Sequence, residues 1–162
     1  MFERIIVPMD GSRLSAEAIP YAVSIAQNYN SEVVLLRVVS KPPINLMTET
    51  NSISNSLTVD LITEQAETKE VENTAHAKRY LMNRGREVKE KGVNVSYEVM
   101  EGSPAHAIME FAKNKKATLI VMMSHGRGRI KAAILGSVTS AIIHGSTVPV
   151  LVIRPKDLLE NN

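Results

Sequence analysis

Five short apolar runs alternate with four stretches of helical periodicity, and this order constrains the fold more than any other feature of the sequence. The apolar runs cover residues 4–7, 33–39, 93–99, 117–123 and 148–153. The helical stretches between them cover 13–29, 61–91, 104–116 and 137–144. Alternation of this kind predicts a parallel sheet with helices on both faces, joined by right-handed crossovers. We therefore expect an α/β fold with three layers, α/β/α.

The run at 93–99 differs from the others, because its apolar residues alternate with polar ones. Val93, Val95, Tyr97 and Val99 recur with a period of two. That period is typical of a strand with one wet face. We expect this strand at an edge of the sheet.

Two predictions concern the first helical stretch, residues 13–29. Ala18, Ala22, Ile25 and Tyr29 fall at helical spacing and predict one buried stripe. Pro20 should either kink this helix or mark its early turns.

We expect a single domain over residues 1–155, followed by a polar tail at 156–162. The segment 40–60 interrupts the domain, since two prolines are followed there by many Ser, Thr and Asn residues. A connection of this length is uncommon in compact domains and usually serves as a lid, a binding loop or a disordered segment. We predict a flexible loop at 40–60, and then a long, mostly polar helix over 61–91.

The composition of the chain argues against several classes of protein and partner. The 162 residues include 19 basic and 17 acidic ones, a net charge of +2 that is too small to attract nucleic acid or membrane along the whole chain. No cysteine is present, which excludes disulfides and cysteine-based zinc sites. The N-terminal residues lack the pattern of a signal peptide, and no apolar run approaches the ~20 residues of a membrane span. We expect a cytoplasmic protein with neither nucleic acid nor membrane as a partner.

The segment 118–140 carries most of the functional signal. An apolar run leads into a glycine and arginine loop, and Gly136-Ser137 then opens a helix. Helix N-termini bind anions because their first backbone N–H groups have no intrahelical partner and the helix dipole favours negative charge. Basic side chains at 127–131 add positive charge nearby. The segment predicts a phosphate site; the alternative is an exposed turn with a serine N-cap.

Asp10 is a second candidate, because it follows the first strand. If strands one and four are neighbours, the winding of the sheet reverses between them, and ligands bind at such a reversal. Asp10 and the glycine loop would then face one crevice. The alternative is that Asp10 is an ordinary turn residue that bonds local N–H groups.

The glycine loop fits neither the Walker A pattern nor the dinucleotide fingerprint. It is similar to the pattern Gly-x2-Gly-x9-Gly-Ser/Thr that marks the ATP-binding universal stress proteins. Gly126 and Gly136-Ser137 fit the last three places, and Met123 stands in the first. The likeness covers nearly the whole chain, through IIVPMDGS, AIPYAVSIA, VVLLRVV and the stretch from EGSPAHAIMEF to VPVLVIRP. The chain therefore resembles the universal stress protein family.

The resemblance implies a fold and a set of site residues. The family fold is a five-stranded parallel sheet of order 3-2-1-4-5, like that of the adenine nucleotide alpha-hydrolases. Pro8 and Met9 would border the base. Asp10 would hold the ribose or nearby phosphate oxygens, and Val39 would meet adenine through its backbone. The phosphates would be surrounded by residues of the loop and the helix start, namely Met123, His125, Gly126, Arg127, Gly128, Gly136, Ser137, Val138 and Thr139.

Met123 leaves two outcomes open. If its position needs positive φ or close approach to phosphate, the side chain weakens binding, and Met123→Gly should tighten it. If only its backbone N–H is used at negative φ, methionine is tolerated. We expect ATP, ADP or AMP as the ligand, with Mg²⁺ as its companion ion.

The expected function is a regulatory stress-response protein that binds a nucleotide and is not an enzyme. The sequence has no nucleophile elbow and no evident triad, and its histidines are not spaced for a metal on a helix. No catalytic or metal-ligating residue is therefore predicted. The alternatives are a slow ATP hydrolase and a stress protein that has lost nucleotide binding and acts only through protein contacts.

The strand at 148–153 predicts a homodimer. It would lie at an edge of the sheet, yet it is strongly apolar, and an exposed apolar edge favours pairing with another chain. The family commonly pairs in this way. The alternative is a monomer whose edge is protected by Pro149, Pro155 and the tail.

Overall fold

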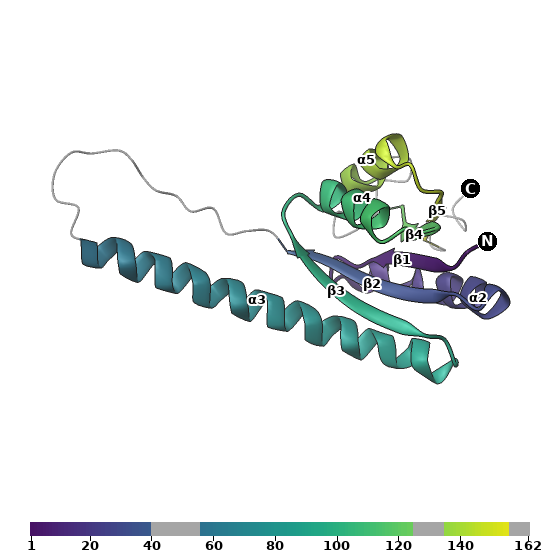
Figure 1. The fold of residues 1–162 in the computed structure, drawn as a ribbon, viewed down its shortest axis with the longest axis horizontal. Coiled ribbons are helices and arrows are strands. Elements are labelled where there is room, and N and C mark those ends of the chain that lie inside the picture. The colour runs from purple at the N-terminus through teal and green to yellow at the C-terminus, as the bar shows by residue number, and fades with distance from the viewer. Residues whose placement is uncertain (40–55, 125–134, 156–162) are drawn as a thin grey trace.

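The computed structural model describes residues 1–39, 56–124 and 135–155, with side chains of the long helix described from residue 68 onward. Its centre is a sheet of five parallel strands in the order β3-β2-β1-β4-β5 (Figure 1). The strands are β1 (Arg4–Pro8), β2 (Glu32–Val39), β3 (Val95–Glu101), β4 (Leu119–Met123) and β5 (Val150–Ile153). The predicted fold class and strand order are confirmed, as is the edge position of β3.

Helices cover both faces of this sheet (Figure 1). One face carries α1 (Arg13–Ala16), α2 (Ile19–Tyr29) and α3 (Ser56–Glu90), and the other carries α4 (Pro104–Asn114) and α5 (Ser137–Gly145). Alternate residues of a strand point to opposite faces, so Ile5 packs into the core on the α2 side and Ile6 into the core on the α4 side. Every residue of β4 is buried, as expected for a central strand covered on both faces.

The first helical stretch is divided, which the prediction of one helix missed. Ser12 caps the four-residue α1 by accepting a hydrogen bond from the Ser15 N–H, and α2 begins three residues after α1 ends. Pro20 lies in the first turn of α2, in agreement with one of the two predicted positions. The buried stripe is wrong at its last residue, because Tyr29 is 51% exposed and meets Phe2 edge to face at the surface.

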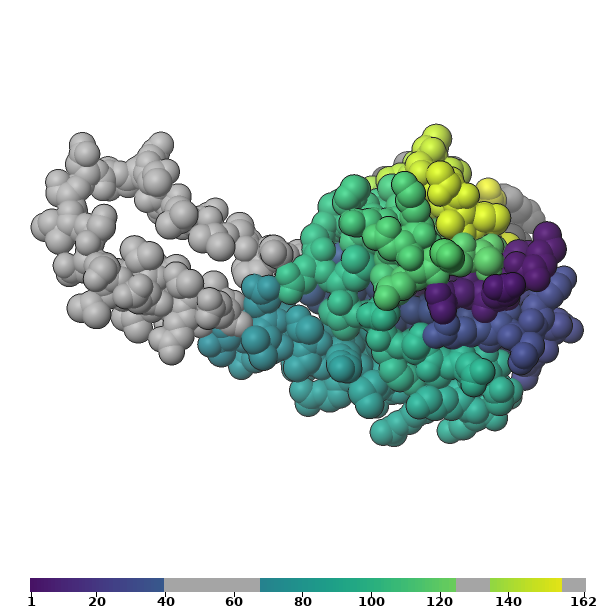
Figure 2. All heavy atoms as spheres, in the orientation of Figure 1, coloured from purple at the N-terminus to yellow at the C-terminus, as the bar shows by residue number. Residues whose placement is uncertain are grey.

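The long helix starts earlier than predicted. α3 begins at Ser56, so the last five residues of the predicted 40–60 loop are helical, and residues 40–55 lie outside the described part of the chain. At 1.5 Å per residue the 35 residues of α3 span about 50 Å, roughly twice the length of the eight-residue β2. The helix therefore runs past the carboxyl ends of the strands (Figure 1), and its residues from 68 onward lie along one side of the rounded body in Figure 2.

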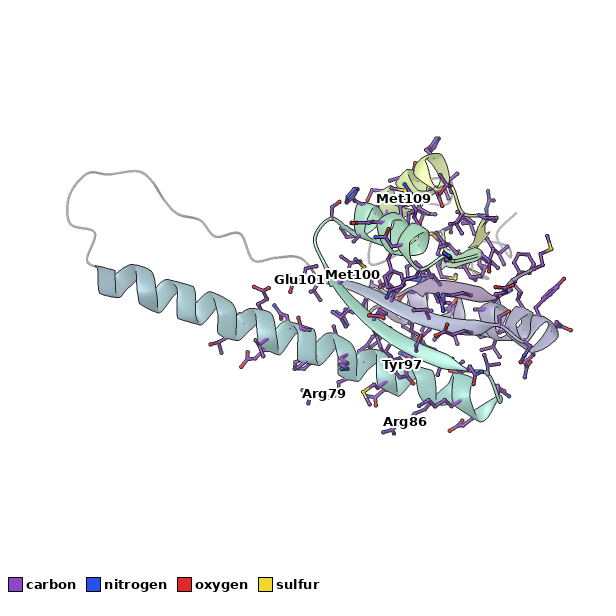
Figure 3. All side chains as sticks on the ribbon, viewed as in Figure 1. Arg79, Arg86, Tyr97, Met100, Glu101 and Met109 are labelled. Carbon is purple, nitrogen blue, oxygen red and sulfur yellow. The ribbon has the colours of Figure 1, made fainter. Side chains whose placement is uncertain are left out.

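Close packing fixes α3 against the edge strand β3. A Cβ atom at Gly85 would lie 2.3 Å from the Tyr97 ring, so a side chain there would displace the tyrosine (Figure 3). Gly85 costs about 1 kcal/mol of helix propensity relative to alanine. The close approach of Tyr97 is the reason that glycine is needed at this place in the helix.

The last strand is shorter than the predicted run at 148–153. Pro149 has no N–H to donate to the sheet, and the Ser146 side chain bonds both the N–H and the carbonyl of Val148, which forms a turn. β5 consequently begins at Val150. Among the described helices, none has the length and apolar character that crossing a membrane requires.

Candidate functional site

The strand order places the two sequence candidates at one end of the sheet. β1 pairs with β2 on one side and with β4 on the other, so the winding reverses between β1 and β4. The Asp10 turn follows β1, and the loop that leads to α5 follows β4. Both leave the carboxyl ends of adjacent strands, which is where parallel α/β sheets bind ligands.

The Asp10 carboxylate shapes its own turn. Its Oδ1 accepts a hydrogen bond from the Ser12 N–H at 2.9 Å, across Gly11, which has a φ of 85°. A residue with a Cβ would be strained at that φ. Asp10 thus makes the local contact that the turn alternative predicts, and it does so at the reversal of the sheet where a ligand role was predicted.

The N-terminus of α5 presents main-chain donors at the same end of the sheet. Gly136 is the N-cap; its N–H donates to the Ser124 carbonyl at 2.9 Å, and its own carbonyl accepts from Ser140 at 2.8 Å. The N–H groups of Ser137 and its next two neighbours precede this first intrahelical bond. Ser137 is exposed, so its hydroxyl is available to a ligand as well. This arrangement is a potential anion site.

Thr139 has a structural contact that the sequence did not reveal. Its side chain is 3% exposed, and its hydroxyl donates to the Met123 carbonyl at 3.1 Å. The bond fixes the first turn of α5 against the end of β4. If Thr139 contacts a ligand, its backbone N–H is the group that remains for that contact.

Met123 occupies the core and not the crevice. Its side chain is 4% exposed and packs in the cluster that also holds Met9 and Ile153. Among the described residues, the non-glycine positions with positive φ are Asn30 and Lys116, so Met123 has an ordinary strand conformation. Of the two outcomes left open by the sequence, this geometry favours the one in which methionine is tolerated.

The residues expected beside the base lie along the ends of β1 and β2. Pro8 is half-buried, whereas the Met9 side chain is 2% exposed and its N–H donates to the Leu36 carbonyl at 2.7 Å. The Val39 carbonyl accepts a hydrogen bond from the Gly102 N–H at 3.1 Å. Met9 therefore belongs to the core, and its neighbour Pro8 offers the more accessible surface.

Four predicted site residues lie outside the described residues: His125, Gly126, Arg127 and Gly128. The other members of the set lie at the carboxyl ends of β1, β2 and β4 and in the first turn of α5, and the side chains of Met9, Met123 and Thr139 are buried.

Among the described residues, the carboxyl end of the sheet includes Asp10 and, at the end of the edge strand β3, Glu101, but no cluster of metal ligands. The parts of the chain that the structure describes contain no group of three or more His, Asp or Glu side chains placed to hold a metal. Glu98 and Glu101 lie on the edge strand β3. His106 faces Glu110 at 3.8 Å on α4, and His144 bonds the Ser140 carbonyl at 2.7 Å one turn earlier on α5.

A hollow of about 720 Å³ lies at the opposite end of the sheet, between the ends of β2, β3 and α3. Glu32 is one of its charged wall residues, and both carboxylate oxygens of Glu32 already have partners, Arg4 and Ser96. The hydrogen bond from the Ser96 hydroxyl, followed by the hydrogen bond and charge of Arg4, lowers the pKa of Glu32, while burial opposes the shift. This hollow is therefore a weaker candidate than the carboxyl end.

The family model of the universal stress proteins matches residues 1–154. The chain belongs to the universal stress protein family. It is 34% identical to a universal stress protein of Methanocaldococcus jannaschii over 95% of this chain and 83% of that one. It is 32% identical to the universal stress protein YxiE of Bacillus subtilis over 95% of this chain and the whole of that one.

Solved structures of the family share the fold. The M. jannaschii protein MJ0577 superposes with a TM-score of 0.78 at 26% identity, covering 96% of this chain and 98% of that one. A universal stress protein solved in complex with cAMP has a TM-score of 0.59 at 21% identity, with coverages of 94% and 97%. An Arabidopsis thaliana family protein solved with AMP bound has a TM-score of 0.57 at 16% identity, with coverages of 97% and 98%. At these lower identities the likeness shows the fold.

Proposed function

We propose that this universal stress protein is a regulatory stress-response protein that binds an adenine nucleotide at the carboxyl ends of β1 and β4. One observation carries the proposal: the first N–H groups of α5 and the Asp10 turn lie at the same reversal of the sheet. The N–H groups suit phosphate oxygens, and a carboxylate suits ribose hydroxyls. A nucleotide carries both kinds of group in one molecule.

Each part of the nucleotide has its own residues. The phosphates lie at the N-terminus of α5, on the N–H groups of Ser137, Val138 and Thr139, with the Ser137 hydroxyl as a further donor. Asp10 accepts from the ribose. The base lies toward Pro8 and Val39, at the ends of β1 and β2. The segment from His125 through Gly128 completes the phosphate side in this proposal.

The ligand class is supported by family members that were solved with cAMP and with AMP. We propose ATP, with ADP and AMP as weaker alternatives, because each further phosphate adds negative charge opposite the helix N-terminus. Bound Mg²⁺ would be held by the nucleotide phosphates themselves, as is usual for this ion. It would neutralise part of their charge.

The site supports binding better than catalysis. No enzymatic activity is indicated by the family matches. Hydrolysis needs a group that activates water, and in this proposal the Asp10 carboxylate is occupied by the Ser12 N–H and by the ribose. We therefore propose signalling through occupancy, with the protein acting in the cytoplasm as a single domain.

Titration calorimetry with ATP, ADP and AMP tests the binding proposal, alongside mass analysis of small molecules released from freshly purified protein. The proposal expects one adenine nucleotide per chain and the tightest binding for ATP. Absence of heat with all three nucleotides, in protein shown to be free of bound nucleotide, would favour the alternative of a stress protein that acts only through protein contacts.

The edge strand β5 supports a homodimer as part of this function. Leu151 on β5 is 36% exposed and Ile143 on α5 is 41% exposed, so both elements at this edge carry an exposed apolar side chain. Sheet edges with apolar side chains pair readily with a second copy. Sedimentation velocity of the wild type and of Leu151→Lys should give a dimer and a monomer, respectively; a wild-type monomer would contradict this part of the proposal.

A further inference from the structure

Tyr80 of α3 contacts the turn that carries Asp10. Its hydroxyl donates a hydrogen bond to the Ser12 carbonyl at 3.2 Å. The two residues are 68 positions apart in the sequence, so the contact joins the long helix to the carboxyl end of β1. The oxygen–oxygen distance of 3.2 Å is longer than the usual range of about 2.5–3.0 Å for an O–H···O bond, so we expect a weak bond.

Ser12 is the centre of the Asp10 turn. Its N–H donates to Asp10 Oδ1 at 2.9 Å, its Oγ accepts from the Ser15 N–H at 3.1 Å, and its carbonyl accepts from the Ser15 hydroxyl at 3.0 Å. Tyr80 bonds that same carbonyl. A shift of Ser12 therefore moves the N–H group that orients the Asp10 carboxylate.

Two arginines hold the Tyr80 ring in place. The guanidinium carbon of Arg37, on β2, is 5.2 Å from the ring centroid, and that of Arg84, one turn further along α3, is 5.5 Å from it. Contacts between a cation and an aromatic face at this range are attractive. The ring is thus fixed from β2 and from α3, while its hydroxyl reaches the Asp10 turn.

We propose that Tyr80 is a positioning residue, which orders the Asp10 turn from α3 and thereby strengthens nucleotide binding. The inference rests on the proposed function, because Tyr80 acts through Asp10 and not by touching the ligand. A carboxylate that is oriented before binding loses less conformational entropy when the ligand arrives. The long helix then contributes to affinity without contributing a ligand contact.

The test compares Tyr80→Phe with Tyr97→Phe. Each variant removes one hydroxyl and keeps its ring. Tyr97, however, lies on the edge strand β3 and packs against Gly85 of α3, whereas Tyr80 bonds the Ser12 carbonyl. Titration with ATP should show about threefold weaker binding for Tyr80→Phe, as expected for one long hydrogen bond, and wild-type affinity for Tyr97→Phe. Equal affinity of Tyr80→Phe and the wild type would overturn the inference and leave the proposed function standing. If the wild type itself did not bind ATP, both the inference and the proposed function would be overturned.

A second readout separates positioning from a general loss of stability. The backbone amide signals of Asp10 and Ser12 in a nitrogen–proton NMR spectrum should shift in Tyr80→Phe and stay in place in Tyr97→Phe. Weaker binding without a shift of these signals would show that the effect does not pass through the Asp10 turn, and would also overturn the inference.

Discussion

Polar groups at the two ends of the sheet have different kinds of hydrogen-bond partner. At the amino end, groups from different strands pair with one another: Arg4 contacts Glu32 at 2.8 Å, Ser96 bonds Glu32 at 2.7 Å, and Thr118 exchanges hydrogen bonds with the Arg4 backbone. At the carboxyl end, the first N–H groups of α5 come before the first intrahelical bond and point out of the helix. The same fold thus has one end at which these polar groups bond to one another and one end at which the N-terminus of α5 presents its main-chain donors.

Stability and nucleotide binding should therefore respond to substitutions at different places in the molecule. Substitutions at the amino end should change the free energy of unfolding and leave nucleotide affinity alone. At the carboxyl end, side chains that point into the core should do the same, whereas changes in the main-chain donors should affect affinity.

The largest expected effect is on stability, from Met123→Ala. Removing a buried methionine costs about 2–5 kcal/mol of unfolding free energy, because a cavity remains. Met122→Ala is the matched control, since Met122 is buried to the same degree on the opposite face of β4. Urea denaturation should show similar losses for both variants, and ATP titration should show unchanged affinity for both. Tighter binding in Met123→Ala alone would mean that its thioether obstructs the crevice.

A smaller loss of stability is expected for Thr139→Val. The substitution keeps the shape of the side chain and leaves the buried Met123 carbonyl without the hydroxyl, at a cost of about 1–3 kcal/mol. Thr147→Val, at an exposed threonine after α5, serves as the control. If denaturation showed no difference between the two variants, the bond from Thr139 to β4 would not be stabilising the helix start.

The smallest effect is expected at the amino end, for Glu32→Gln. The pair with Arg4 is partly exposed, so we expect less than about 1 kcal/mol at neutral pH. Because the pKa of Glu32 is lowered in the folded state, its contribution is fully present above the ordinary value of 4.5 and is lost as the pH falls below that value. Denaturation measured as a function of pH should show the variant less stable at pH 7, with a difference that shrinks progressively as the pH falls below 4.5, and Glu98→Gln is the control. If the variant stayed equally destabilised at low pH, the effect would come from the shape of the side chain and not from the charge of Glu32.

Much of this fold could be predicted from the sequence because it depends on periodicity. Alternating runs gave the parallel sheet, and the period of two at Val95, Tyr97 and Val99 placed β3 at an edge. The start of α3 was missed because its first residues, SLTVD, include β-branched and polar residues that are weak helix formers. The spacing of apolar residues is a weaker guide to the start of a helix where the helix extends beyond the sheet.

The candidate site likewise has features that could be predicted from the sequence and contacts that could not. Asp10 and the helix start at Gly136 are visible as motifs, and the strand order then brings them to one end of the sheet. The contacts from Thr139 to Met123 and from Tyr80 to Ser12 join residues that are 16 and 68 positions apart. No spacing rule links such pairs, because both depend on how the helices sit on the sheet.

The proposed phosphate site at the N-terminus of α5 can be probed by ATP titration of two variants, Ser137→Pro and Ser137→Ala. Proline suits the first position of a helix, and the backbone of the preceding Gly136, with φ −59° and ψ 151°, is compatible with a following proline. Proline removes both the N–H and the hydroxyl, whereas alanine removes the hydroxyl alone. If the main chain of α5 holds the phosphates, Ser137→Pro should bind at least about tenfold more weakly and Ser137→Ala within about twofold of the wild type. Equal affinities for the proline and alanine variants would contradict the account.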